Sequence, residues 1–184
     1  ILVMSGSGSV GLMALFAVDL LDMLFISMLG QIELAAAVGF AGTLMFFSTS
    51  VSIGTSIAMG ALVSKAIGAK DWDNARQLSG SILITAFAIS LVFTGFMFAY
   101  IPELLAMIGA EGATAERAEA YLQILVPSGP FLAVAMAAGA GLRSAGDAKR
   151  SMWVTLSGGI VNAILDPIFI FGFNWNVEGA ALAS

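Results

Sequence analysis

Long apolar stretches follow one another along the chain and constrain its fold more than any other feature. Between Arg76 and Glu103, for example, there is no charged residue. The hydrocarbon core of a bilayer is about 30 Å thick, which a helix of about 20 apolar residues can cross. Such a segment satisfies its backbone polar groups internally, as a lipid environment requires. The stretches therefore predict transmembrane helices.

Composition supports the same class. Apolar residues make up 59% of the 184 residues, charged residues make up only 10%, and the mean hydropathy is +0.99. Soluble domains have about 45–50% apolar and about 25% charged residues. A globule of this composition could not cover its surface with polar groups, so we expect an integral membrane protein.

The predicted fold class is an all-α integral membrane bundle of five transmembrane helices and the start of a sixth. The chain begins with Ile1 rather than Met and ends in an apolar stretch, so we expect it to be part of a longer protein. The five helices are predicted at residues 2–29, 34–66, 75–100, 118–142 and 152–173, and the sixth begins at residue 179.

Basic residues indicate the orientation of the bundle. Six of the seven flank two loops, which five alternating helices place on one side of the membrane; the opposite loops are acidic. By the positive-inside rule, the N-terminus and both basic loops are predicted to be cytoplasmic in a multi-pass protein of the plasma (inner) membrane. The six basic residues are Lys65, Lys70, Arg76, Arg143, Lys149 and Arg150.

Missing residue types exclude several kinds of chemistry. The chain has no cysteine and no histidine, which removes disulfides, thiolate nucleophiles and most transition-metal sites. We expect no cofactor, and no metal beyond a possible sodium ion. The net charge of −5 and the lack of a basic run argue against nucleic acid as a partner.

Carboxylates inside the predicted helices are the candidate functional residues. A charged side chain near the bilayer centre costs roughly 2.5–3.5 kcal/mol, so it usually faces a cavity or a partner. Asp22 and Asp166 each lie seven residues before the outer end of their helix, at the same depth of about 10 Å. Two carboxylates at one depth could share a proton or a sodium ion. Asp19 is a possible additional member, although it would repel Asp22 if both were ionised.

Asn162 and Pro167 strengthen the case for Asp166. Asn162 lies one helical turn before Asp166, on the same helix face, and its amide could bind a cation or hold the carboxylate. Pro167 lacks an N–H, which should free the carbonyl of Ala163. Freed carbonyls line ion sites in transporters. The alternative is that these polar groups only join helices together.

Two further features concern the walls of the bundle. Pro127 and Pro130 fall inside the helix predicted at 118–142 and should kink it. Hydroxyl residues recur in the helix predicted at 34–66, where they suit close packing or the wall of a substrate cavity. These are Thr43, Ser48, Thr49, Ser50, Ser52, Thr55 and Ser56.

Several motifs, in order over almost the whole chain, resemble the multidrug and toxic compound extrusion (MATE) family. Asp22 lies in the first motif, a polar turn forms the second, and Asn162 and Asp166 lie in the fourth. The matching stretches are residues 21–30 (LDMLFISMLG), 68–76 (GAKDWDNAR), 142–150 (LRSAGDAKR), 162–167 (NAILDP) and 179–184 (GAALAS).

This resemblance implies a twelve-helix exporter of two six-helix lobes, of which this chain is most of the N-terminal lobe; the C-terminal lobe is missing. Such an antiporter is coupled to sodium or protons and extrudes organic cations or other amphipathic small molecules. The implied cation-binding residues are Asp22, Asn162, Asp166 and Ser184, where Ser184 replaces the usual Thr. Some members have a Tyr one turn before the first Asp, and this chain has Val18 there. That departure leaves sodium, proton or both open.

Two other functions are compatible with a multi-helix membrane chain. A flippase for lipid-linked oligosaccharides would share the architecture, but it should carry basic residues inside the membrane, and the predicted spans have none away from their loop-flanking ends. An intramembrane aspartyl protease needs a carboxylate dyad. The only Gly-Asp pair, Gly146-Asp147, lies in a basic loop, which counts against that enzyme. A secondary transporter rather than an enzyme is therefore expected.

Overall fold

The computed structural model describes Met13, Leu20 and residues 32–168, and every regular element in these residues is helical. The helices predicted at 2–29 and from 179 lie outside the described residues. The described elements are α2 (Ile32–Gly68), α3 (Trp72–Ala99), α4 (Ile101–Met107), α5 (Gly112–Leu125), the 3₁₀ turn η1 (Val126–Ser128), α6 (Gly129–Ser144) and α7 (Ala148–Pro167).

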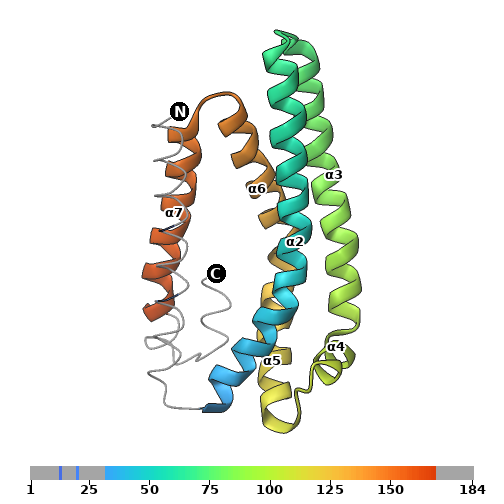
Figure 1. Ribbon diagram of the computed structural model, residues 1–184. Helices are drawn as coiled ribbons and strands as arrows, with labels where there is room; N and C mark the ends of the chain where they lie inside the picture. The colour runs from blue at the N-terminus through green and yellow to red at the C-terminus, as the bar shows by residue number, and fades with distance from the viewer. Residues whose placement is uncertain (1–12, 14–19, 21–31, 169–184) are drawn as a thin grey trace.

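Three segments of the described chain are long and apolar enough to cross a membrane. They are Ala36–Gly68, Trp72–Ala99 and Gly112–Ser144. Figure 1 shows α2 and α3 side by side as an antiparallel pair, with α5, η1 and α6 following one another along it. At 1.5 Å per residue, the 37 residues of α2 extend about 55 Å, well beyond the bilayer core. Helix α2 must therefore tilt or project into the aqueous phase.

The two loops that carry most of the basic residues, before α3 and before α7, share one hydrogen-bonding pattern. Before α3, the amide of Asp71 donates to the Ala66 carbonyl (3.0 Å); before α7, the amide of Asp147 donates to the Leu142 carbonyl (2.9 Å). These bonds close the preceding helix, and each Asp side chain then accepts the amide three residues later in the next helix, at 3.1 Å. The residue before each Asp has positive φ: Gly146 at 84° and, unusually for a side chain, Lys70 at 60°.

Pro102 explains the end of α3 and the start of α4. It lies in the first turn of α4, where a missing N–H costs nothing, and the chain turns at Tyr100 just before it. This seven-residue helix was not expected from the sequence. The next helix was predicted to begin at residue 118, whereas α5 begins at Gly112 and so includes the polar residues Thr114, Glu116 and Arg117.

The predicted kink is confirmed between α5 and α6. The third apolar segment is interrupted by η1, which contains Pro127 and directly precedes Gly129-Pro130. The Ser128 hydroxyl donates to the Leu125 carbonyl at 2.7 Å, and the Gly129 amide donates to the Val126 carbonyl, so the break is internally bonded. In Figure 1, α6 leans toward the loop that leads to α7.

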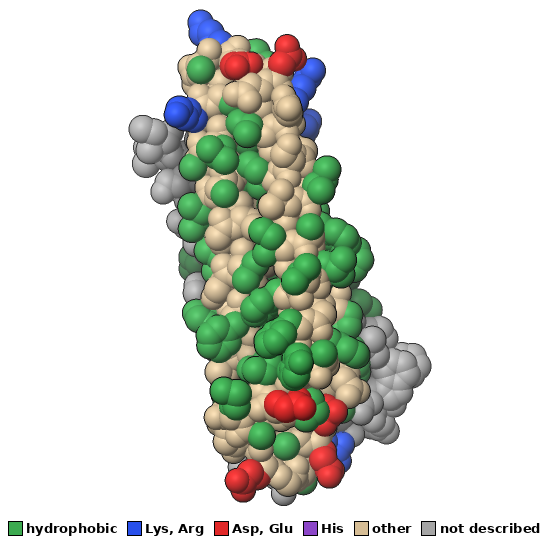
Figure 2. All heavy atoms as spheres, turned by 90° about the vertical axis from the view of Figure 1, so that its right-hand side faces the viewer, with side chains coloured by type: hydrophobic (Ala, Val, Ile, Leu, Met, Phe, Trp, Pro, Cys, Tyr) green, Lys and Arg blue, Asp and Glu red, His purple; other side chains and the backbone are tan. Residues whose placement is uncertain are grey.

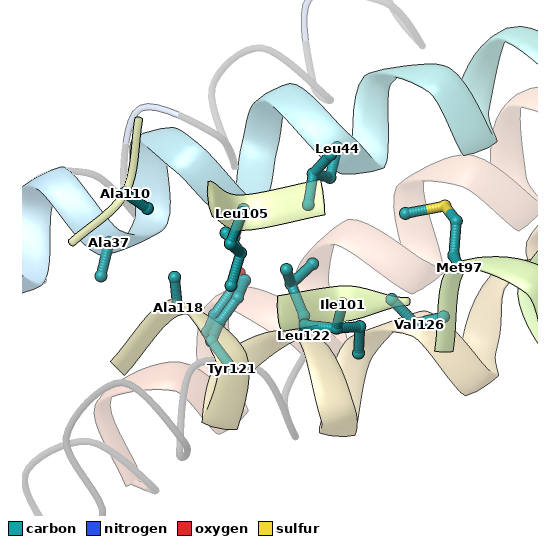
Figure 3. Close-up of a cluster of buried hydrophobic side chains, with 11 residues drawn as sticks. Ala37, Leu44, Met97, Ile101, Leu105, Ala110, Ala118, Tyr121, Leu122 and Val126 are labelled. Carbon is teal, nitrogen blue, oxygen red and sulfur yellow. The ribbon is translucent and has the colours of Figure 1, made fainter. Parts of the chain in front are cut away.

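Two apolar clusters hold the helices together. The first lies at the acidic end, where α2, α4 and α5 meet; it includes Leu44, Ile101, Leu105 and Leu122, each at most 4% exposed (Figure 3). The second lies toward the basic end, where Met59 and Val63 of α2 pack against alanines of α3 and α6. Small residues in the second cluster allow the helix axes to approach closely.

Candidate functional site

The structure reaches only part of the predicted cation site. Asp19, Asp22 and Ser184 lie outside the described residues, as does Val18. Asn162 is half-buried in α7, and the backbone of Asp166 lies four residues later in the same uninterrupted helix. One helical turn thus separates these two residues, the spacing that the prediction requires. The side chain of Asp166 is not among those described, so whether Asp22 and Asp166 meet stays a prediction.

Among the described residues, helix α7 packs mainly against α6. The Arg143 guanidinium at the end of α6 donates to the Ser151 hydroxyl in the first turn of α7, at 2.8 Å. The Asp147 cap adds a second constraint, since its carboxylate also pairs with the exposed Arg150 at 3.1 Å. Both contacts lie at the basic end of the bundle. They fix the N-terminal end of α7. Asn162 lies about 15 residues, or about 22 Å, further along this helix.

The described part of the chain contains a buried polar layer that the sequence analysis found only in part. Ser48 and Ser52 of α2 and Ser90 and Thr94 of α3 are all at most 7% exposed. They lie between the two apolar clusters: along α2, Leu44 precedes Ser48, and Met59 follows Ser52. We call these four residues the hydroxyl layer.

Gly129, at the break between η1 and α6, packs against this layer. A β-carbon at this position would lie 2.9 Å from Thr94 Oγ1, 3.2 Å from Ser48 Oγ and 3.8 Å from Ser90 Oγ. Only glycine lets the three segments approach this closely. The proline-induced break and the hydroxyl layer therefore form one site, at which all three long apolar segments meet.

Two hydroxyls of the layer lack partners within the described part of the chain. Ser90 Oγ and Thr94 Oγ1 are buried and accept or donate no hydrogen bond there, whereas Ser52 donates to the Ser48 carbonyl at 3.3 Å. Most buried polar groups in proteins are bonded, and an exception calls for an explanation such as strain, water or an ion. Hydroxyl oxygens can bind water or an alkali cation, but the layer has no carboxylate to carry a proton or to balance a charge.

Five other hydroxyls of α2 form bonds within their own helix. Thr43, Thr49 and Ser50 donate to carbonyls four residues earlier, at 2.8–3.0 Å. Thr55 and Ser56 both donate to the Ser52 carbonyl at 2.9 Å. These bonds occupy the hydroxyl donors of the five residues, and whether the residues also line a substrate cavity stays a prediction. Sequence spacing could have revealed Ser90 and Thr94, which are one turn apart on the α3 face that also carries buried Ala86 and Met97.

Charge is separated along the bundle axis. Figure 2 shows Lys and Arg side chains gathered at one end, with few Asp and Glu, and mainly Asp and Glu at the other; the surface between them is largely hydrophobic. Exposed large side chains in this middle region include Phe46, Ile84, Val92 and Phe131, each at least 66% exposed. In water such a surface would aggregate, whereas in a bilayer it faces lipid.

These features define a multi-pass α-helical membrane protein with a polar layer inside its bundle. The MatE family model matches residues 9–168, and the chain belongs to this family, the MATE transporters. The expected family is therefore confirmed, as is the expected all-α membrane fold. Members of this family are secondary transporters rather than enzymes, in agreement with the expectation for this chain.

Individual relatives agree. The chain is 27% identical to the FAD transporter of Shewanella oneidensis over 98% of its own length and 41% of that protein. It is 30% identical to the multidrug export protein MepA of Staphylococcus aureus over 90% of its length and 37% of that protein. The chain thus spans about two fifths of the curated relatives it matches.

Solved structures match the fold closely. A MOP superfamily transporter from Pyrococcus furiosus, described as having a binding pocket of reversed polarity, superposes with a TM-score of 0.93 at 28% identity, over 98% of this chain and 40% of that one. A multidrug resistance MATE transporter in an outward-facing conformation gives 0.90 at 28% identity, over 95% and 38%.

Proposed function

We propose that the complete protein is a cation-coupled antiporter that exports organic cations or other amphipathic small molecules, driven by sodium or protons. Membership of the family, and the relatives named as multidrug export proteins, support this proposal. The described chain would form most of the N-terminal lobe, and a second lobe would complete the substrate cavity. Transport driven by an ion gradient would need no cofactor.

The observation that carries the proposal is the polar turn in α7. Asn162 and Asp166 lie one turn apart, near the end of a helix that starts at the basic loop. We infer that Asp22 and Asp166 bind the coupling ion, with Asn162 and Ser184 supplying neutral oxygens and Asp19 as a possible additional member. Ion binding would neutralise the carboxylates and favour a conformation that releases a cationic substrate. This coupling requires the ion to bind the two conformations with different affinity.

Transport by carboxylate variants of the complete protein tests the mechanism. Asp22→Asn and Asp166→Asn keep the size of the side chain and remove its charge, so each should abolish efflux driven by a sodium or proton gradient in proteoliposomes. Glu116→Gln, at the exposed acidic end of α5, is the matched control and should leave efflux unchanged. Ion-driven efflux retained in both Asp variants would refute the assignment.

The FAD transporter among the relatives favours a second candidate, the export of an anionic dinucleotide. A substrate of that charge calls for basic residues within the membrane, as the flippase for lipid-linked oligosaccharides does. Among the described residues, lysines and arginines lie near the helix ends instead (Figure 2). The organic-cation proposal therefore stands first, and competition between FAD and a cationic dye in the same vesicles separates the two candidates. The intramembrane aspartyl protease has no support from the relatives.

A further inference from the structure

An open groove lies at the basic end of the bundle, away from the polar turn of α7. It has a volume of about 240 Å³ and lies where α2, α3 and α6 meet. Val63, Ile67 and Ala75 form apolar walls, and Ser79 lies deepest along α3. Compact ligands of drug size occupy pockets of about 300–1,000 Å³, so this groove is too small and too open for one. Its shape and its lining suit part of an extended hydrocarbon chain.

The mouth of the groove carries the two side chains that are typical of a membrane interface. Trp72 is 59% exposed, and Arg76 lies one turn further along α3; both line the groove. Tryptophan is enriched at the level of the lipid headgroups, because its ring is apolar and its N–H is polar. The hydrophilic loop between α2 and α3, residues 68–71, lies just beyond Trp72 and marks the aqueous side. The groove therefore runs from headgroup level toward the hydrocarbon.

Arg76 is the only charged residue that lines the groove, and it forms no ion pair within the described chain. Three carboxylates also lie at this end, but two of them are engaged: Asp71 caps α3, and Asp147 caps α7 and pairs with Arg150. Asp73, in the first turn of α3, does not line the groove. With six basic residues around them, these carboxylates leave this end of the bundle positive.

We propose that this groove binds one anionic phospholipid, with its phosphate on Arg76 beside Trp72 and part of one acyl chain between α2, α3 and α6. Basic pockets between helices are the usual sites for acidic headgroups. A guanidinium suits a phosphate because its N–H groups can donate two parallel hydrogen bonds. The site is separate from the proposed ion site and does not depend on the transported compound.

Lipid binding to the complete protein tests this proposal. The protein is purified in detergent, titrated with phosphatidylglycerol or phosphatidylcholine, and examined by native mass spectrometry. Wild type should retain one phosphatidylglycerol in preference to phosphatidylcholine. Arg76→Gln should reduce this preference about fivefold, the effect of one basic residue near a membrane surface. Lys65→Gln removes the same charge from the same end but from outside the groove, and it should change the preference little.

A second variant tests the acyl-chain part of the site. Ser79→Phe fills the groove and should abolish the tightly bound lipid, whereas Ser79→Ala, which loses only a bond to its own helix, should not. The melting temperature in the absence of lipid shows that each variant is folded. Equal losses for Arg76→Gln and Lys65→Gln would reduce the effect to general surface charge and overturn the proposal. Competition by millimolar glycerol phosphate would also overturn it, because a soluble anion would then be enough.

Discussion

At the residue scale, the contact between Gly129 and the hydroxyl layer makes the most specific demand on a single position. Thr94 Oγ1 and Ser48 Oγ lie 2.9 Å and 3.2 Å from the place where a β-carbon would be. A methyl group there must displace these buried hydroxyls, either by side-chain rotation or by a shift of α2 and α3 away from the α5–α6 break. Overpacking of this kind costs about 1–3 kcal/mol.

Gly129→Ala should therefore lower the stability of the complete protein in detergent. Gly95→Ala is the matched control: it lies in α3 near the same layer, but a β-carbon there would meet nothing within 4 Å. In a helix, that control should be neutral or slightly stabilising, because alanine is the better helix former. Equal melting temperatures for the two variants would show that the contact at Gly129 is not tight.

Lys70 is the subject of a second prediction at the residue scale, in which a substitution raises the stability of the protein. Its φ of 60° is a left-handed conformation that costs a side-chain residue about 1–2 kcal/mol, whereas the equivalent position before α7 is Gly146. Lys70→Gly should raise the melting temperature, and Lys70→Ala, which removes the same charge but keeps a β-carbon, should not. If both variants behave alike, the charge rather than the backbone decides the stability at this turn.

At the element scale, the prolines in the third apolar segment show what the sequence predicts well. The break was expected from Pro127 and Pro130, because proline acts on its own helix and needs no tertiary context. The cap of α3 is equally local, since an Asp at a helix start accepts a nearby amide whatever surrounds it; Asp71 and Asp73 both qualify from the sequence, and Asp71 is the one that caps.

Other features escaped prediction because they depend on packing. Helix α4 is only seven residues long, too short to be recognised from its sequence. Its residues Ile101 and Leu105 are buried through packing against Leu122 in the first apolar cluster (Figure 3). The hydroxyls of α2 stand out in the sequence, but tertiary packing decides that Ser48 and Ser52 are the buried ones. Ser90 and Thr94 were not predicted, because hydropathy does not show which face of α3 meets α2. Of the proposed cation site, the described residues include only Asn162 and the backbone of Asp166, one turn apart.

The break itself predicts a measurable geometry. Pro127→Ala with Pro130→Ala restores two backbone donors, so α5 and α6 should merge into one straighter helix. Spin labels at Glu116 and Ala145, both exposed, should then lie farther apart in double electron–electron resonance measurements. Pro102→Ala is the control, because the first turn of α4 accommodates proline without cost. An unchanged distance in the double variant would mean that packing at Gly129, rather than proline, maintains the break.

At the scale of the whole molecule, the separation of charge predicts how the bundle lies in the membrane. The basic end should face the cytoplasm and the acidic end the outside. This stretch has no cysteine, so single cysteines report position cleanly once any others in the complete protein are replaced. In intact cells, an impermeant thiol reagent should label Glu116→Cys, whereas Lys149→Cys should react only after permeabilisation. The reverse pattern would invert the orientation.

The hydroxyl layer also bears on how such a bundle could change shape. Interlocked branched side chains resist sliding, because each must leave a fitted hole before it can enter the next. Serine and threonine hydroxyls are smaller, and they can exchange one oxygen partner for another by rotating a single bond. A plane of them between two interdigitated blocks, crossed by a helix already broken at the same level, gives the bundle a natural pivot. Helices α5 and α6 could then tilt against each other at this level, along the continuous helices α2 and α3.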